Sequence, residues 1–159
     1  MTEAGMGGEV DYSEFIDHLL DLGFSRIGEG SFRSCYLRSK VVIKVPINGD
    51  GIMDNRTEAA AWHKYKSRPT PKGYMLAPCR MLPNGCLMMV TVDRYAGYEV
   101  LHQEEWSRKI EGGQVGLYRG RVLAFDFALN IPERAEWEDK WGIKSEWFYF
   151  HGWNNNEYQ

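Results

Sequence analysis

The sequence predicts an α+β domain in which a curved, five-stranded antiparallel sheet carries one main helix and is followed by a short hairpin and a helical tail. Short β-branched and aromatic segments separated by turn residues indicate the strands. An alanine-rich segment between the third and fourth strands indicates the main helix. The length of 159 residues and the hydrophobic fraction of 43% suit a single compact domain with an ordinary buried core.

A short amphipathic helix is predicted near the N-terminus. Residues 1–10 are small and glycine-rich, and we expect them to be disordered. Asp11 followed three residues later by Glu14 is a capping-box pattern, which predicts that a helix begins here. Gly23 ends this helix, and its apolar face consists of Phe15, Ile16, Leu19 and Leu20.

Three consecutive antiparallel strands and the main helix come next. Turn-forming GEGS and a tight RSK connection separate the strands, which are predicted at residues 24–28, 34–38 and 41–47. Residues 48–55 contain two glycines and indicate a polar loop. Residues 56–67 have high helix propensity from their alanines, and we expect this helix to end before Pro69.

The remaining elements are a hairpin, a second hairpin and a helical tail. Residues 74–82 and 86–92 predict two strands that turn at PNG, which completes the five-stranded sheet. Residues 93–113 are mixed in composition, with a helix considered within 99–109. Residues 115–129 alternate between apolar and polar positions around an Arg-Gly turn, which indicates two further strands. In the tail, Trp137 and Trp141 are four residues apart, as on one face of a helix.

Composition excludes several function classes. The 19 Lys and Arg residues nearly balance the 22 Asp and Glu residues, so the net charge of −3 does not indicate a nucleic-acid partner. Three cysteines without metal-ligand spacing suit free thiols in a reducing compartment, so we expect a cytoplasmic protein. No apolar segment is long enough to span a bilayer, so no membrane association is expected. The four histidines are scattered without the spacing of metal ligands.

Chemistry-bearing residues occur in a characteristic order. A glycine-rich turn with Gly28 and Gly30 precedes Lys44 on the third strand, Glu58 on the helix, and Asp126 at the end of the second hairpin. Taken singly, Lys44 is more often a solvated strand lysine and Glu58 a residue on a solvated helix face. An ionised Asp126 between two phenylalanines needs a partner. The ordered series resembles the signature of the protein kinase family, which implies a fold like the small lobe of a kinase.

The resemblance implies a site for ATP and magnesium. Backbone amides of the glycine-rich turn would approach the phosphates, and Lys44, held by an ion pair with Glu58, would offer them a positive charge. Asp126 would bind the magnesium ion. The residues implied for the nucleotide are Gly28, Gly30, Ser31, Phe32, Lys44 and Glu58, and those implied for the metal are Asp126 and Gln114.

Departures from the family pattern affect the catalytic residues most. Arg33 replaces the third glycine of the loop, and Ala128 replaces the glycine that follows Asp126-Phe127. Alignment of the segment before Asp126 places Lys109 where the family has its catalytic aspartate and Gln114 where it has a metal-binding asparagine. No catalytic residue is therefore assigned, because the general base of the family is missing.

The chain is also short for a kinase. Residues 11–159 are expected to form one kinase-like domain, in which 11–92 resemble the small lobe and 93–159 are a reduced remnant of the large lobe with an aromatic tail. Only about 33 residues follow Asp126, too few for an activation segment and a substrate platform of normal size. This combination is similar to the compact kinase-like proteins of bacteriophages.

Two functions follow from the resemblance as hypotheses. The first is a non-catalytic, pseudokinase-like protein, in the cytoplasm of a host cell, that binds and inhibits a host protein or a defence complex such as a CRISPR effector. The tail would supply partner-binding residues, namely Trp137, Trp141, Trp147 and Trp153. The second is a minimal ATP- and magnesium-dependent phosphotransferase of the Ser/Thr protein kinase type. A third alternative is that the motifs are accidental on an unrelated α+β domain.

Overall fold

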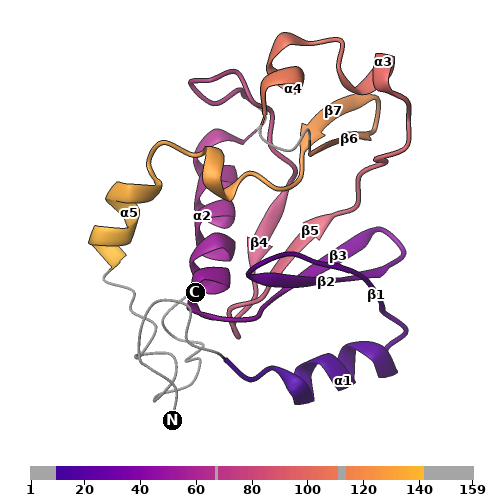
Figure 1. Ribbon diagram of the computed structural model, residues 1–159, viewed down its shortest axis with the longest axis vertical. Helices are drawn as coiled ribbons and strands as arrows, with labels where there is room; N and C mark the ends of the chain where they lie inside the picture. Colours follow the sequence, from indigo (N-terminus) through magenta and orange to yellow (C-terminus); the bar gives the residue numbers. More distant parts are fainter. Residues whose placement is uncertain (1–9, 67, 111–113, 142–159) are drawn as a thin grey trace.

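The computed structural model describes residues 10–66, 68–110 and 114–141 of the chain. It contains a five-stranded antiparallel sheet with the strand order β1-β2-β3-β5-β4 and a separate antiparallel pair of β6 and β7 (Figure 1). The predicted α+β class with a five-stranded antiparallel sheet is therefore confirmed. The strands are β1 Ser25–Glu29, β2 Arg33–Arg38, β3 Val41–Pro46, β4 Cys79–Met81, β5 Leu87–Val90, β6 Val115–Tyr118 and β7 Arg121–Ala124. The helices are α1 Ser13–Asp21, α2 Gly49–Tyr65, α3 Tyr98–Leu101, α4 Glu105–Lys109, α5 Arg134–Trp141 and the 3-10 helix η2 Ala128–Asn130.

Helix α1 covers part of one face of the five-stranded sheet. Of the four residues predicted for its apolar face, Phe15, Ile16 and Leu19 pack with side chains of β2 and β3, whereas Leu20 is 47% exposed. The predicted capping box is wrong in detail, because Tyr12 occupies the N-cap position without a side-chain hydrogen bond. The helix start is instead stabilised by the Asp11 carboxylate, which accepts a hydrogen bond from the backbone N–H of Ser13 at 2.9 Å.

Helix α2 is longer than the sequence indicates. The polar loop predicted at residues 48–55 is wrong, because α2 already begins at Gly49 and includes almost all of this segment. The side chain of Asn48 caps the helix by accepting a hydrogen bond from Gly51 N at 3.0 Å. Burial against the sheet outweighs the low helix propensity of the glycines. The buried residues that this extension adds to the helix include Ile52, Met53, Asp54 and Asn55.

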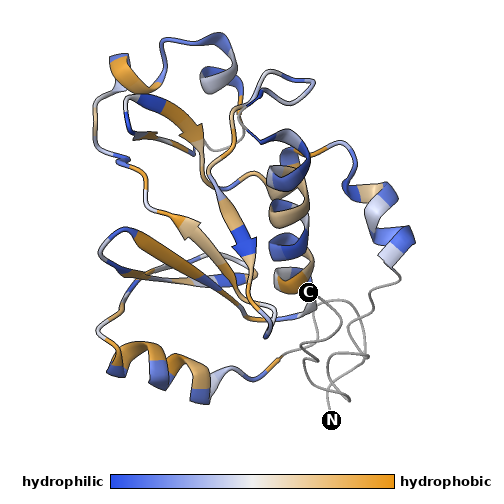
Figure 2. Cartoon of the chain, turned by 180° about the vertical axis from the view of Figure 1, so that it is seen from behind, coloured by the Kyte–Doolittle hydropathy of each residue, from blue (hydrophilic) through white to orange (hydrophobic). Residues whose placement is uncertain are grey.

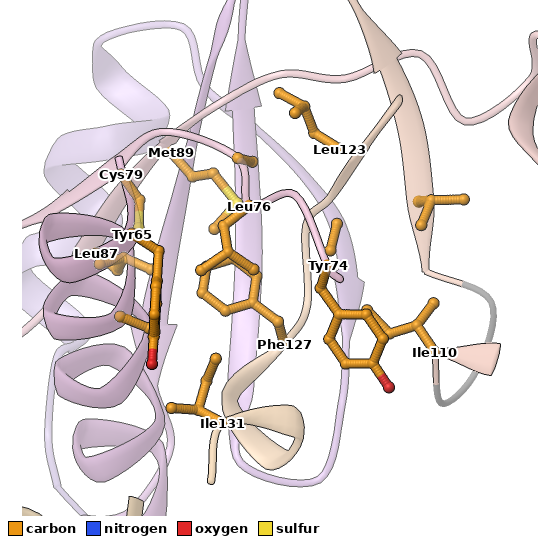
Figure 3. Close-up of a cluster of buried hydrophobic side chains, with 14 of the residues drawn as sticks. Tyr65, Tyr74, Leu76, Cys79, Leu87, Met89, Ile110, Leu123, Phe127 and Ile131 are labelled. Atoms are coloured by element: carbon orange, nitrogen blue, oxygen red, sulfur yellow. The ribbon is translucent and has the colours of Figure 1, made fainter. Parts of the chain in front are cut away.

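The larger core lies where α2, the β4–β5 hairpin and the β6–β7 hairpin meet. Its central residue is Phe127, which is fully buried. In Figure 3 the ring of Phe127 lies among Tyr65, Leu76 and Ile131. Hydrogen bonds of Ala124 with Met75 and Ala77 hold the end of β7 beside the segment that precedes β4. This packing fixes the segment that carries Asp126 against α2.

The second half of the chain differs in part from expectation. The helix considered within 99–109 is divided into the short helices α3 and α4. Trp137 and Trp141 lie on α5, as predicted. The disorder predicted for residues 1–10 concerns, apart from Val10, residues that lie outside those described, and so do Trp147 and Trp153. Cys35, Cys79 and Cys86 are free thiols. Within the described residues, no helix is both long enough and apolar enough to cross a membrane.

Gly51 allows the β1–β2 turn to touch the first turn of α2. A Cβ atom at this position would lie 2.1 Å from the carbonyl oxygen of Phe32, far inside van der Waals contact. The same oxygen accepts a hydrogen bond from Ile47 N at 2.7 Å, so it is held from two sides. The turn and the helix can therefore separate only if backbone moves.

Substitution Gly51→Ala tests this contact. We expect the free energy of unfolding to fall by about 1–3 kcal/mol, because an added methyl group in a packed site forces the backbone to shift. Urea unfolding followed by circular dichroism measures the change. Gly28→Ala is the matched control, since a Cβ at Gly28 meets nothing within 4 Å. Equal losses for the two variants would contradict the proposed contact.

Candidate functional site

The predicted pair of Lys44 and Glu58 forms in the structure. Lys44 Nζ lies 2.9 Å from Glu58 Oε1, and the Glu58 side chain is fully buried. Strand β3 directs Lys44 toward α2, while its neighbours Ile43 and Val45 pack with α1 on the other face. Lys44 also donates a hydrogen bond to the carbonyl oxygen of Phe125. The alternative interpretations, in which Lys44 and Glu58 are solvated surface residues, are therefore wrong.

Arg33 is the residue that changes the character of this site. Its guanidinium lies 2.7 Å from Glu58 Oε1 and 3.3 Å from Glu58 Oε2, and it donates to Asp126 Oδ1 at 2.9 Å. A further hydrogen bond goes to Asn55 Oδ1 at 3.1 Å, and Nε lies 4.0 Å from Asp54 Oδ2. A guanidinium has five N–H donors, and this arrangement engages all four on its terminal nitrogens. Arg33 thus bridges the two acidic residues implied for nucleotide and metal.

Asp126 and Gln114 also lie together, as the family alignment implies. With the Gln114 amide oriented so that its nitrogen faces the carboxylate, it donates to Asp126 Oδ2 at 2.8 Å. In this orientation Asp126 accepts hydrogen bonds on both oxygens, from Arg33 and from Gln114. The Asp126 side chain keeps 41% of its surface exposed. Asp126 is therefore paired within the protein yet accessible from the cleft.

Backbone groups complete the surroundings of Glu58. Its Oε2 accepts hydrogen bonds from the backbone N–H groups of Phe127 at 2.8 Å and Ala128 at 3.2 Å. Burial by itself would raise the pKa of the Glu58 carboxyl, but the charges of Arg33 and Lys44 and their hydrogen bonds outweigh it and lower that pKa to about 2. Glu58 is ionised at neutral pH as a result.

A second acidic residue links the site to α5. Asp54 Oδ1 lies 2.6 Å from a guanidinium nitrogen of Arg134, which is the first residue of α5. Burial raises the pKa of Asp54 above its ordinary value, and the positive charges of Arg33 and Arg134 counter this in part. Burial alone would lower the pKa of Arg33, yet Glu58, Asp126 and Asp54 together raise it. With Lys44 as the third cation beside Arg33 and Arg134, three positive charges balance the three carboxylates.

A cleft of about 250 Å³ opens beside this cluster. Gly30, Ser31 and Phe32 of the glycine-rich turn line one side, and Asp126 and the exposed Leu129 line another. Gly28 belongs to β1 and pairs with Cys35, which also borders the cleft. The predicted nucleotide residues therefore surround one cavity, apart from Gly28, which is not among its lining residues, and Glu58, which lies behind Arg33.

The cluster does not fit ATP and magnesium in this arrangement. Arg33 already holds Asp126 and shields Glu58, and the balanced charges leave no excess positive charge for a triphosphate. Lys44 has two of its three donors engaged. Among the residues that the structure describes, no group of three or more His, Cys, Asp or Glu side chains could hold a metal ion. The arrangement is suited to hold the β1–β2 turn, α2 and the end of β7 together.

The remaining predicted positions lie outside the cleft. Lys109, at the position of the catalytic aspartate of the family, forms an exposed ion pair with Glu105 on α4 at 2.6 Å. Trp137 and Trp141 stack with ring centroids 5.6 Å apart, and the Arg56 guanidinium lies 4.2 Å from the Trp141 ring. Trp137 packs partly against the main core. A partner-binding role for these tryptophans stays a prediction.

Sequence reasoning missed four residues of the cluster. Arg33 was visible as a departure from glycine, but a missing glycine does not reveal where the new side chain points. Asp54 and Asn55 lie in the segment assigned to a loop, so their place on the buried face of α2 was not expected. Arg134 precedes two tryptophans in a tail without apolar periodicity, and nothing in the sequence connects it to Asp54.

Comparison with protein-family models, curated proteins and solved structures finds no match to this chain.

Substitution Glu58→Gln tests the central ion pairs. It leaves Arg33 and Lys44 buried without a shared carboxylate, so we expect the free energy of unfolding to fall by about 3–5 kcal/mol. Glu105→Gln is the control, because its pair with Lys109 is exposed and its loss should cost no more than about 1 kcal/mol. Chemical unfolding of the three proteins provides the comparison. Similar stabilities for the two variants would rule out a structural role for the cluster.

The lowered pKa of Glu58 predicts a dependence of stability on pH. The folded-state pKa of about 2 lies below the ordinary value of 4.5, so the contribution is complete above pH 4.5 and is lost as pH falls toward 2. The loss amounts to about 3 kcal/mol. Asp54, whose pKa is raised, acts in the opposite sense and offsets part of it. Carbon NMR of the labelled carboxyl group measures the titration directly, and a midpoint above pH 4.5 would contradict the ion pairs.

Proposed function

We propose that this chain is a non-catalytic, kinase-like binding protein, encoded by a bacteriophage, that binds and inhibits a host protein or a defence complex such as a CRISPR effector. The observation that carries the proposal is the Arg33 guanidinium, which bonds to both Glu58 and Asp126. In a kinase-like active site these two carboxylates would serve the phosphate-binding lysine and the metal. Here they hold an arginine of the same chain.

Several features support the kinase-like part of the proposal. The glycine-rich turn and the strand lysine line one cleft, and the helix glutamate lies behind Arg33 at its wall. Lys44 and Glu58 pair at 2.9 Å, although they are separated by 14 positions in the sequence. Asp126 follows β7 and reaches the same cleft. Accidental motifs would not be expected to converge in this way.

Other features support the absence of catalysis. The position aligned with the general base is Lys109, a surface residue paired with Glu105. Phosphoryl transfer depends on a positioned metal and on positive charge around the transferred group. Arg33 pairs with Asp126, the carboxylate that would bind the metal, and the charges of the cluster balance. A chain with these properties is suited to act through its surface.

One observation favours the phosphotransferase alternative. The Lys44–Glu58 pair is formed, and a cleft of about 250 Å³ lies next to Asp126. Nucleotide binding would then require Arg33 to leave Asp126 so that a metal ion could replace it. The cost of separating a buried arginine from its carboxylates is about 3–5 kcal/mol, which weakens any such binding by about a hundredfold to a few thousandfold.

Calorimetric titration with ATP and magnesium distinguishes the two functions. We expect no saturable binding to the wild-type chain up to about 1 mM nucleotide. Asp126→Asn is the matched variant, because the residue is partly exposed and the amide keeps its shape. Micromolar binding to the wild type that Asp126→Asn abolishes would support the phosphotransferase hypothesis instead.

A transfer assay in host lysate extends the comparison. With γ-labelled ATP, added wild-type and Asp126→Asn proteins should give the same labelling, and the host protein that co-purifies with each should be the same. Labelling of a host protein that depends on Asp126 would overturn the proposal. Loss of the co-purifying protein in a folded Asp126→Asn variant would place partner recognition in the cleft.

A further inference from the structure

We infer that a shallow apolar groove over β3, β5 and β4 docks a segment of the partner protein in which an apolar side chain is flanked by carboxylates. The groove is separate from the Arg33 cleft, and no residue lines both. The inference rests on the proposed function, because it names the surface by which a binding protein of this kind would engage its target. Four residues form its apolar floor and wall, namely Val41, Trp62, Met88 and Val90.

The position of α1 explains why this surface is open. Residues directly opposite on neighbouring strands share a face of the sheet, so Val41 and Val90 lie on one face with Met88. Ile43 lies on the same face and is covered by α1. In Figure 1, α1 runs along the β1–β2–β3 part of the sheet, whereas β4 lies beside α2. The part of this face beyond α1 therefore stays half-buried and apolar. The groove continues around the edge strand β4 to Trp62 of α2, which packs on the opposite face.

The shape of the groove suits side chains of a peptide. Its volume is about 270 Å³, just below the range of about 300–1,000 Å³ that small-molecule sites span. Trp62 of α2 closes one side, and a tryptophan at the wall of a pocket is a frequent anchor of binding energy. Met88 adapts to ligands of different shape. Figure 2 shows mainly hydrophobic colours along strands of this sheet, next to α2, whose residues are mixed in hydropathy.

Positive charges surround the groove. Arg80 lines it and is exposed, and the Lys66 ammonium lies 5.5 Å from the centre of the Trp62 ring. Lys40 is exposed and immediately precedes Val41. None of the described residues that line the groove is acidic. An apolar side chain flanked by Asp or Glu complements this surface both in shape and in charge.

The chain as a whole carries a net charge of −3, so this local excess of positive charge is not a property of the entire surface. Binding to it would depend on salt, because exposed charges are screened over about 8 Å at physiological ionic strength. The apolar contact with Trp62 and Met88 would be affected far less. A docked peptide would therefore keep part of its affinity at high salt, whereas general attraction between charges would not.

Fluorescence anisotropy with synthetic peptides tests the inference on the full-length protein. The probe is a fluorescein-labelled peptide with one phenylalanine between pairs of glutamates. One control peptide has lysines in place of the glutamates, and another has alanine in place of the phenylalanine. We expect the probe to bind at least about tenfold more tightly than either control. Equal binding of the probe and the alanine peptide would overturn the inference.

Two protein variants locate the binding. Arg80→Glu and Met88→Asp should each lower the affinity for the probe at least about tenfold, because each places a carboxylate at the groove. Lys72→Glu is the control, since this exposed residue is not part of the groove lining. Circular dichroism verifies that the variants fold. Unchanged affinity in folded Arg80→Glu and Met88→Asp would overturn the assignment of the site.

Two other occupants give different results. If Trp147→Ala or Trp153→Ala raises the affinity for the probe, the C-terminal segment of this chain occupies the groove, and the partner assignment is wrong. A dimer that Arg80→Glu converts to monomer would assign the groove to a second copy. Failure of the groove leaves the binding function intact, because capture of the host protein would then persist in Arg80→Glu. Phosphotransfer that depends on Asp126 would overturn the proposed function whatever the peptide does.

Discussion

The buried carboxylate of Glu58 is the interaction on which the rest of the structure depends. It accepts hydrogen bonds from Arg33 on β2, Lys44 on β3 and two backbone amides after β7. An ionised carboxylate without partners in a protein interior costs several kcal/mol, so Glu58 holds these elements together only while all of its partners remain. A single side chain therefore links the β1–β2–β3 hairpins, α2 and the end of β7, in addition to the packing around Phe127.

Under the proposed function, Arg33 is the reason that a kinase-like cleft would hold no nucleotide. A glycine at position 33 would leave space between Glu58 and Asp126, whereas Arg33 fills that space with a positive charge and a planar set of donors. In the proposed kinase-like site, the guanidinium pairs with the two carboxylates that would otherwise serve the phosphate-binding lysine and a metal ion. The cleft beside it keeps its glycine-rich turn but has balanced charge. The proposed binding function would then use other surfaces, such as the apolar groove over β3, β5 and β4.

Sequence patterns predicted the fold well where the pattern is local. Local strand patterns located the five strands, although β4 covers only Cys79–Met81 of the segment predicted at 74–82. The resemblance to kinases implied that Gly30, Lys44, Glu58 and Asp126 would meet. The start of α2 was missed, because burial of Ile52 and Met53 outweighs the two glycines and propensity alone cannot include that burial. The role of Arg33 was missed for a related reason. A side chain's partners depend on tertiary positions of Glu58 and Asp126 that are distant in sequence.

A crystal structure grown with magnesium and a non-hydrolysable ATP analogue tests the central claim most directly. The account predicts that the Arg33 guanidinium stays within hydrogen-bond distance of both Glu58 and Asp126, with no triphosphate in the cleft. The contrary result is a metal ion bound to Asp126 and phosphates bound to Lys44, with the Arg33 side chain displaced from both carboxylates. That result would show that nucleotide and metal displace the Arg33 side chain from a working nucleotide site.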